Sequence, residues 1–521
     1  MHIFLKLKDQ LAKKSSNNAR ADNYINNKIK KFFVCWFYPL EIINSLVYNS
    51  IRQTKEEDYM KVFQPKILTL FKDYSKKQLV SDLIAGLIVA IIALPLSIAL
   101  AIASGVSPEK GLYTAIVAGF VIALLGGSKV NISGPTAAFA TIVAGIVYTE
   151  GLDGLVIATL LAGAMLILLG LLRVGTLIKF IPKSITVGFT AGIAITIVIG
   201  QIKDFLGITF PAGTHAVETS EKVAAIFANI SSMNWLALLV GALSLAILII
   251  WPRVSKKIPG SLIAVLFGTI LVLVTSLQVF TIGDLYTITS APPKFSLPEI
   301  TVDKVVSLIP SAFTIALLAG VESLLSCVVS DKMIDDKHNP NTELIALGVG
   351  NICSGLFGGI PATGAIARTA ANVRNGGRSP ISGIVHAIVL LLVLVILMPY
   401  AALIPMPVIA AILFIVAYNM SEWREFLHIL KEKHWADTLV LVLTFALTVI
   451  FDLVVAIITG LILHYVILLA KNLISKYKNK KSPDLVEENL PLNELVDAED
   501  KALAFGSVEG LPLNQDDNSE L

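Results

Sequence analysis

The sequence predicts an all-α polytopic membrane protein with about fourteen transmembrane segments, and three observations support this prediction. First, 55% of the 521 residues are hydrophobic and only 15% are charged, and the mean hydropathy of +0.77 lies far above that of soluble domains. Second, apolar runs follow one another from Val80 to about Leu473 with short polar breaks. Third, basic residues gather in every second break. The net charge of +3 is too small to indicate nucleic-acid binding, and three widely spaced cysteines predict neither a disulfide framework nor a metal site.

The segments follow from dividing the apolar runs by about 20 residues per crossing. They are expected at 82–104, 110–126, 134–148, 153–172, 182–203, 233–251, 258–280, 304–330, 341–358, 361–373, 379–399, 401–419, 435–450 and 451–473. Residues 1–80 are expected to form a cytoplasmic or interfacial N-terminal region, with an interfacial amphipathic segment at 32–72. Residues 81–473 form the transmembrane domain, and the acidic tail 474–521 is expected to be cytoplasmic and disordered.

Lysine and arginine mark the cytoplasmic breaks, because loops on that side are enriched in them. These residues follow each even-numbered segment: Lys129; Arg173, Lys179 and Lys183; Arg253, Lys256 and Lys257; Lys332 and Lys337; Arg374 and Arg378; Arg424, Lys431 and Lys433; and Lys476 to Lys481. An even count of segments with both termini in the cytoplasm follows.

A faint internal repeat divides the domain into halves of about 81–280 and 300–473. "LLGGSKVNISGPTAAFA" (124–140) echoes "LFGGIPATGAIARTA" (356–370), and an Ile-Pro pair opens a helix downstream of each, at 181 and 404. If each half holds an odd number of segments, such as seven, the halves have opposite topology in the membrane. Inverted repeats of this kind are a transporter architecture.

Segments three and ten are predicted to be half-helices. The apolar stretches after Pro135 and Pro361 run for about 14 residues or fewer, which is too short to cross the hydrocarbon core. Each proline is expected in the first turn of its helix. The residues that follow are small, and they leave the backbone N–H groups accessible: Thr136, Ala137 and Ala138, then Thr363, Gly364 and Ala365. Two such helix starts facing each other near the midplane would form an anion site.

Two charged residues lie near this expected site. Arg368, one turn beyond the second helix start, adds a full positive charge, and a charge at membrane depth is by default functional. The alternative is that Arg368 pairs with a carboxylate such as Glu322 and locks helices together. Glu322 lies deep inside its segment and could load and release a proton, unless it is a satisfied structural carboxylate. Ser326, one turn on, would share its hydrogen bonding.

Other polar and helix-breaking residues give weaker signals. Pro95 interrupts the first segment, so that Ser97 and Leu100 would line the cavity, although a purely structural kink fits equally well. His386 and His464 are interpreted as helix-contact residues rather than relays. No Walker A, HExxH, CxxC or GxSxG motif is present, so an enzyme is not expected.

Two stretches carry a family resemblance. "SPEKGLYTAIVAGFVIALLGGSKVNISGPTAAFA" (107–140) and "GNICSGLFGGIPATGAIARTAANVRNGGRSPISGIVH" (350–386) resemble the sulfate permease (SulP) family, the bacterial relatives of the solute carrier 26 proteins. The likeness runs from about Asp82 to Leu473. The stretches most similar to the bacterial C4-dicarboxylic acid transporter branch are "DLIAG", "SGPTAAF", "QIKDFLG", "ESLL", "AIARTAANVR" and "NMSE".

The resemblance implies about fourteen segments in two inverted repeats of about seven. Segments one to four and eight to eleven would form a core domain, the rest a gate domain, and transport would move core against gate like an elevator. Carried onto matching positions, the family's substrate site falls at Leu100, Thr136, Ala137, Ala138, Gly364, Ala365, Ala367 and Arg368. Its coupling position falls on Glu322. Family members usually end in a cytoplasmic STAS domain, but only about 48 residues follow Leu473, so a complete one is not expected.

The function expected from the sequence is secondary active transport of small anions. C4-dicarboxylates (succinate, fumarate, aspartate) carried by proton symport come first, and sulfate or bicarbonate next. An uncoupled anion channel and a nucleobase permease remain alternatives. No cofactor or metal is expected beyond a coupling proton or sodium ion. The expected partners are a small anionic substrate, the lipid bilayer of the bacterial inner membrane and a second copy in a homodimer. Two helix starts and one arginine suit many oxyanions, so the substrate stays open at this stage.

Overall fold

The computed structural model describes residues 63–69, 74–176, 182–211, 216, 218–255, 258–432, 434–450 and 453–479. Most of the expected interfacial segment 32–72 and the tail from 480 onwards lie outside these residues. The chain divides into two compact units, one up to Leu461 and one from Ile462. Within the described residues, the second unit consists of the later part of helix α19.

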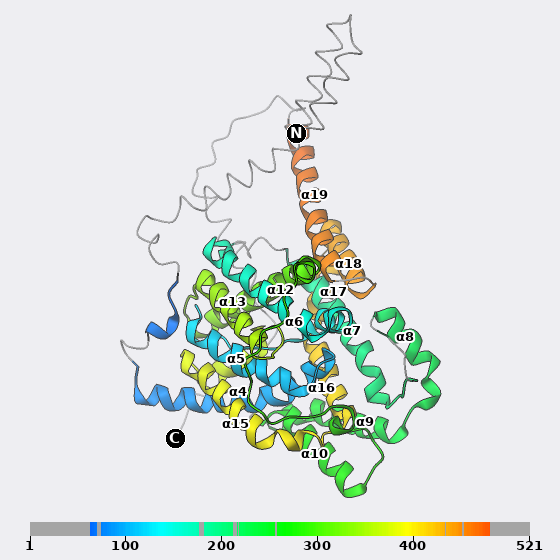
Figure 1. The fold of residues 1–521 in the computed structure, drawn as a ribbon. Coiled ribbons are helices and arrows are strands. Elements are labelled where there is room, and N and C mark those ends of the chain that lie inside the picture. Colours follow the sequence, from blue (N-terminus) through cyan, green and yellow to red (C-terminus); the bar gives the residue numbers. More distant parts are fainter. Residues whose placement is uncertain are drawn as a thin grey trace, which may run out of the picture. The chain divides into compact units, whose positions relative to one another are not determined.

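Helices dominate the described part of the chain (Figure 1). They are η2 (Lys66–Thr69), α4 (Lys76–Ala103), α5 (Pro108–Leu125), η3 (Ala137–Phe139), α6 (Ala140–Leu171), α7 (Lys183–Leu206), α8 (Thr219–Ala228), η5 (Ile230–Ser232), α9 (Trp235–Val254), α10 (Gly260–Thr275), α11 (Ile282–Leu285), α12 (Val302–Ile334), α13 (Pro340–Leu356), α14 (Ile366–Arg374), α15 (Pro380–Ala401), α16 (Met406–Met420), α17 (Trp423–Lys431), α18 (Trp435–Ile450) and α19 (Leu453–Asn479). The two strands are β1 (Ser133–Gly134) and β2 (Thr363–Gly364).

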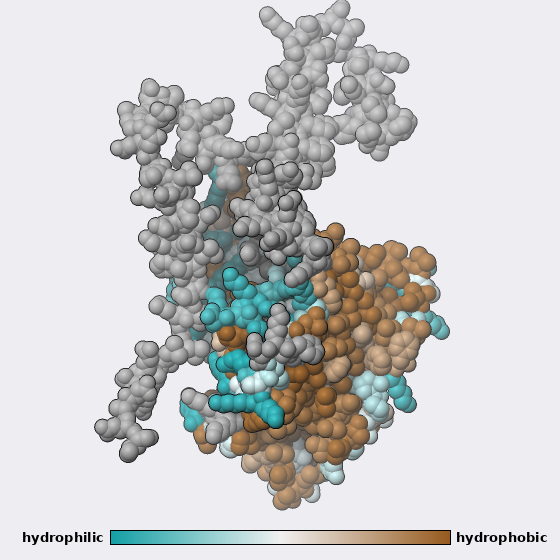
Figure 2. Space-filling view, turned by 90° about the vertical axis from the view of Figure 1, so that its left-hand side faces the viewer, coloured by the Kyte–Doolittle hydropathy of each residue, from teal (hydrophilic) through white to brown (hydrophobic). Residues whose placement is uncertain are grey.

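Helix length and exposure confirm a membrane protein with several crossings. Within the described ranges, 8 helices are long and apolar enough to span a bilayer, and α10, α18 and the 455–471 stretch are shorter apolar helices. Figure 2 shows a broad expanse of hydrophobic residues on one side of the molecule. Large apolar side chains such as Val274 (78% exposed) and Trp235 (71%) would be costly in water, whereas lipid can cover them.

The pairing of β1 with β2 corrects the expectation of a purely helical fold. The strands are antiparallel, with Ser133 opposite Gly364 and Gly134 opposite Thr363. They also correct the expectation that Pro135 and Pro361 lie in the first turn of a helix. Pro135 follows β1, and helical structure begins only at Ala137. Pro361 precedes β2, and α14 begins at Ile366. Proline lacks a backbone N–H, so it fits extended backbone beside a short ladder.

Helix breaks are found at some predicted positions and not at others. Segments three and four form a single element, α6, which is interrupted at Gly151, where φ is 71° and ψ is −169°. Glycine adopts this conformation without a Cβ penalty. Pro95 lies inside α4, which continues through it. Three short helices, α8, α11 and α17, were not expected.

Packing sorts the helices of the first unit into two groups. α4, α5, α6, α12, α13, α14 and α15 contact mainly one another, and α7, α8, α9, α10, α16, α17 and α18 do the same, with smaller contacts of α4 and α6 across the two groups. Helices α6 and α13 approach closely where glycines face each other. A methyl group added at Gly163 would lie 2.6 Å from the Gly348 carbonyl oxygen. Small residues permit such backbone approach between membrane helices.

The segment before α4 is anchored to loops of the first group. The Lys66 amide donates to the Gly126 carbonyl at 2.9 Å. The Lys66 ammonium lies 3.5 Å, and that of Lys129 3.0 Å, from Asp336 Oδ2. Burial alone would raise the pKa of Asp336, but a backbone hydrogen bond at Lys337 and the two lysines outweigh it and lower that pKa below its usual value.

Candidate functional site

The two predicted half-helix starts meet at the β1–β2 crossing. Because the strands are antiparallel, the elements that follow them leave the ladder in opposite directions, so both helix starts flank the same few residues. The Ala365 amide donates to the Ile132 carbonyl at 2.9 Å and extends the contact by one residue. The local sequence explains this extended backbone, since glycines and prolines disfavour a helix on both strands.

Neither helix start is capped by a side chain. At η3 the N-cap is Thr136, and at α14 it is Ala365, and no side-chain hydrogen bond caps either one. The first N–H groups of a helix have no partner within the helix, so they are donors for a ligand, and each start carries about half a positive charge. Ala365 is partly exposed and Ala367 is exposed, whereas Ala137, Ala138 and Gly364 are buried.

Arg368 crosses from α14 to the opposite half-helix. Its Nη2 donates to the Pro135 carbonyl oxygen at 2.6 Å, and the residue is only 2% exposed. Gly134 permits this approach, because a Cβ at that position would lie 2.6 Å from Arg368 Nη1. Nε and Nη1 have no hydrogen-bond partner among the described residues. The guanidinium therefore links the two half-helices through Nη2, and its Nε and Nη1 atoms are available as donors.

Glu322 binds the other half-helix rather than the arginine. Thr136 Oγ1 donates to Glu322 Oε2 at 2.9 Å. In the described part of the chain no ion pair within 4.0 Å joins Glu322 to Arg368, although the two charges are close enough to interact electrostatically. The alternative in which a direct Glu322–Arg368 pair locks the helices is therefore wrong for this structure. Glu322 is only partly buried.

Helix α12 contacts β2 and the start of η3 with one face. Thr363 Oγ1 donates to the Ala319 carbonyl at 2.8 Å, and Thr136 is bonded to Glu322 three residues further along. Residues three and four apart lie on the same side of a helix. The carboxylate is thus placed at the β1–β2 crossing by the same helix face that positions β2.

Ser326 does not share the hydrogen bonding of Glu322, which corrects the sequence-based expectation. Its Oγ donates to Asn131 Oδ1 at 2.7 Å and lies 3.0 Å from Thr369 Oγ1. The loop before β1 passes beside this turn of α12 and offers Asn131 as a better-placed acceptor. Ser326 is fully buried and belongs to a structural network behind the crossing.

Glu343 is the centre of that network, a role that no local pattern in the sequence predicts. Its Oε2 accepts from the Gly127 and Ser128 amides at 2.9 and 3.2 Å. Its Oε1 accepts from Asn131 Nδ2 at 2.7 Å and Ser323 Oγ at 3.2 Å. Glu343 is fully buried. A carboxylate with four donors is well compensated, so its role is to hold the loop before β1.

Leu100 has no hydrogen-bonding role at the crossing, and it is 2% exposed. It lies on α4, which packs against both α6 and α14. Ser97, on the same helix, is fully buried, and its hydroxyl has no partner among the described residues. The structure therefore brings Thr136, Ala137, Ala138, Gly364, Ala365, Ala367, Arg368 and Glu322 to one crossing. Leu100 lies on a neighbouring helix.

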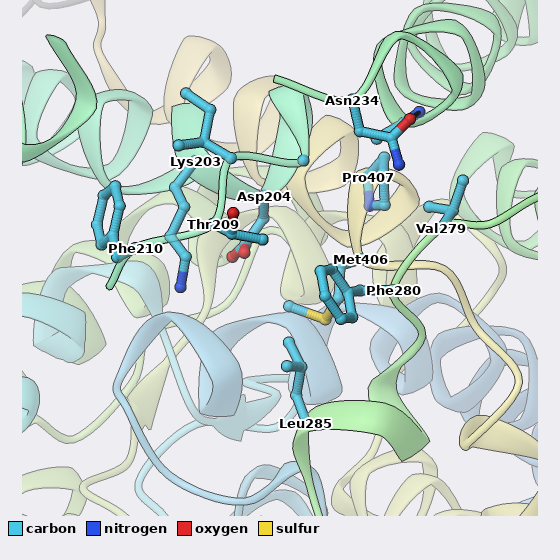
Figure 3. Close-up of a pocket in the computed structure, with 13 residues that line it drawn as sticks. Lys203, Asp204, Thr209, Phe210, Asn234, Val279, Phe280, Leu285, Met406 and Pro407 are labelled. Carbon is cyan, nitrogen blue, oxygen red and sulfur yellow. Dashed lines mark hydrogen bonds between the residues drawn. The ribbon is translucent and has the colours of Figure 1, made fainter. Parts of the chain in front are cut away.

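A cavity of about 220 Å³ lies elsewhere, at the ends of α7, α9 and α16 (Figure 3). Its lining includes Lys203, Asp204 and Phe210. The Lys203 ammonium lies 5.1 Å from the centre of the Phe210 ring. None of the predicted substrate residues lines this cavity, so it is separate from the β1–β2 crossing.

The fold and the crossing define a polytopic membrane transporter, and the comparisons identify its family. The model of the sulfate permease family matches residues 79–444, so the chain belongs to this family. A relative from Bacillus subtilis (strain 168) with the name "Putative sulfate transporter YvdB" is 44% identical over 448 residues, which cover 85% of this chain and 83% of YvdB.

Solved structures agree with this assignment. The transmembrane domain of the cyanobacterial bicarbonate transporter BicA is 31% identical, with a TM-score of 0.67, over 74% of this chain and 98% of that one. SLC26A9, at 20% identity and a TM-score of 0.71 over 84% and 71% of the two chains, shares the fold. The family and these relatives are transporters, and the chain is an anion transporter of the same family and not an enzyme.

Proposed function

We propose that the chain is a secondary active transporter of C4-dicarboxylates such as succinate, fumarate and aspartate, in symport with protons across the bacterial inner membrane. The observation that carries the proposal is the pair of uncapped half-helix starts beside the buried Arg368. Helix starts and a guanidinium both favour an anion's oxygen atoms. The site residues are Leu100, Thr136, Ala137, Ala138, Gly364, Ala365, Ala367 and Arg368.

Glu322 is proposed as the coupling residue. Its carboxylate accepts a hydrogen bond from Thr136, the residue that opens the first half-helix. An ionised carboxylate at this place repels an incoming anion, and in a medium of low dielectric constant that repulsion is large. Protonation removes the repulsion, so proton and anion bind together. Sodium is the alternative coupling ion.

The movement proposed is that of a core domain against a gate domain. The grouping of helices by packing supports it, because the first group holds both half-helices and the second group holds neither. About fourteen segments in two inverted repeats, cytoplasmic termini and a homodimer complete the proposal. Both half-helices would move together as parts of the core domain, so the proposed anion site would stay assembled during the movement.

Bicarbonate and sulfate are alternatives to C4-dicarboxylates as the transported anion. The dicarboxylate assignment rests on "QIKDFLG", "AIARTAANVR" and "NMSE". Bicarbonate is favoured by the similarity to BicA over most of that transmembrane domain, and sulfate by the family match. An uncoupled channel would carry the same anions along their own gradients.

Uptake into proteoliposomes tests the proposal. Labelled succinate, bicarbonate and sulfate are offered in turn, with an inward proton gradient, an inward sodium gradient or neither. We expect saturable succinate uptake driven by protons. Arg368→Ala should abolish saturation, whereas Arg374→Ala should not, because Arg374 is exposed at the far end of the same helix. Flux that follows only the anion's own gradient would favour the channel, and no saturable flux of any of the three anions would refute anion transport here.

A further inference from the structure

Buried polar groups around the crossing fall into two kinds. Glu343 has four donors, and Asn351 has its amide paired with backbone atoms of Leu347 and Ala362. His386, on α15, differs: it is fully buried, and neither Nδ1 nor Nε2 has a hydrogen-bond partner among the described residues. Buried polar atoms in native proteins are almost always paired, with protein or with ordered water.

Arg368, on α14, is in the same state. It lacks partners for Nε and Nη1, again within the described residues, and it is 2% exposed. Arg368 lies within electrostatic range of His386. Two incompletely paired side chains, one from α14 and one from α15, thus occupy one buried region.

Helix α5 connects these groups. A Cβ added at Gly134 would lie 3.4 Å from the Cα of Ala115 and 2.6 Å from Arg368 Nη1. A Cβ added at Gly119 would lie 3.2 Å from the Ser133 carbonyl oxygen and 3.8 Å from His386 Nδ1. Residues 115 and 119 are four apart and lie on the same side of the helix. Arg368 and His386 therefore line the same face of α5, about one turn apart, and Gly119 leaves space beside the ring.

A molecule bound between these groups must both accept hydrogen bonds from Arg368 and donate hydrogen bonds to acceptors. The unpaired guanidinium atoms only donate, with one N–H on Nε and two on Nη1. A neutral imidazole has one donor and one acceptor nitrogen, and the Ser133 carbonyl, which faces Gly119, adds an acceptor. Water can donate and accept at once, and buried waters bridge groups of this kind.

We propose that Arg368, His386 and the Ser133 carbonyl hold one or two buried water molecules behind β1, and that His386 is thereby a positioning residue for Arg368. The side of the guanidinium turned toward α5 is then satisfied by water, and the remaining N–H groups are directed to the anion. This inference rests on the proposed function only in its kinetic consequence. The water site itself does not depend on which anion is carried.

Transport kinetics test the positioning role. His386→Phe keeps a ring and removes both nitrogens, and Gly119→Ala fills the space beside Nδ1. Each should raise the KM for the transported anion about three- to tenfold, the effect of one buried hydrogen bond, with little change in Vmax. The double variant should be no worse than the stronger single one, because both remove the same water. His386→Gln should restore much of the affinity, and the exposed His434→Phe is the control.

Each kinetic outcome bears on the inference. If wild-type protein transports and His386→Phe leaves the KM unchanged, His386 is not a positioning residue. Additive effects of the two substitutions would also overturn the inference, because they would then act separately. If His386→Phe fails to fold, Gly119→Ala and His386→Gln decide the matter. Absence of any wild-type anion uptake refutes the proposed function instead.

Solid-state NMR in lipid gives a readout that needs no transport. With ¹⁵N-labelled histidine, His386→Gln identifies the signal of the ring. We expect magnetisation transfer from water to a ring nitrogen of His386, and its loss in Gly119→Ala. A ring without water contact in wild-type protein would overturn the water site.

Discussion

Replacing Gly134 by alanine tests how Arg368, the arginine proposed to bind the anion, is held. The added Cβ would lie 2.6 Å from Arg368 Nη1 and 3.4 Å from its Cζ. Carbon and nitrogen do not tolerate 2.6 Å, and the end of a long side chain moves more easily than backbone. We therefore expect the guanidinium to shift and to lose its 2.6 Å hydrogen bond to the Pro135 carbonyl, while the fold survives.

The magnitude follows from the bond that is lost. A hydrogen bond to a charged group contributes about 1.5–3 kcal/mol. At about 1.4 kcal/mol per tenfold, anion affinity should fall roughly 10- to 100-fold. Uptake kinetics give the change in KM, and anion-induced thermal stabilisation of purified protein gives an independent measure of binding.

Gly145→Ala is the matched control for this substitution. Gly145 lies on α6 shortly after the first half-helix start, and an added Cβ there meets nothing within 4 Å. Alanine in a helix interior should be neutral or stabilise by about 0.5–1 kcal/mol. If Gly134→Ala transports with the same KM as Gly145→Ala, the guanidinium does not need its Pro135 contact, and the reasoning about Arg368 is wrong.

Three further predictions concern carboxylates. Glu322→Gln should keep anion binding but lose its dependence on the proton gradient, because the residue can no longer ionise; uptake still driven by protons would contradict this. Glu343→Gln places an NH₂ group among donors and removes about two hydrogen bonds, so the melting temperature should fall while the KM of the surviving protein stays close to wild type; an unchanged melting temperature would argue against the network. The pKa of Asp336 is lowered in the folded protein, so the stability that its ion pairs with Lys66 and Lys129 contribute is fully present above the usual pKa of 3.8. That stability is lost only as the pH falls through the lower pKa of the folded state. Hydrogen exchange of the Lys66 amide, corrected for intrinsic rates, should therefore show constant protection between about pH 8 and 5, and loss of protection within that range would contradict the assignment.

The membrane class, most helix positions and the placement of Arg368 and Glu322 near the two predicted helix starts could be predicted from sequence. Most apolar runs longer than about 15 residues correspond to an observed helix, although several helix ends differ from the predicted ends by about five residues and segments three and four form the single element α6. Arg368 and Glu322 stood out because a charge among apolar and small residues has a cost that needs a reason. These signals depend only on neighbouring residues in the sequence, so they can be recognised without knowledge of the fold.

Features that depend on contacts distant in sequence could not be predicted. β1 and β2 have two residues each, too few for any periodicity, and they exist only because each is the other's partner. Glu343 read as an ordinary acidic residue in a first helical turn, and nothing local connects it to Asn131. Ser326 was assigned to Glu322 by spacing along one helix, whereas a loop from the other half of the chain supplies its actual partner.

The crossing strands have a consequence for biosynthesis. Arg368 and the Pro135 carbonyl that it binds are 233 positions apart in the sequence. When only the first half of the chain has been synthesised, β1 is present without its partner strand β2 and without Arg368. The nascent half must wait in the membrane with an unpaired backbone edge. A gene divided between residues 286 and 300 would therefore encode two polypeptides that form the β1–β2 crossing, and with it the proposed anion site, only when they are produced together.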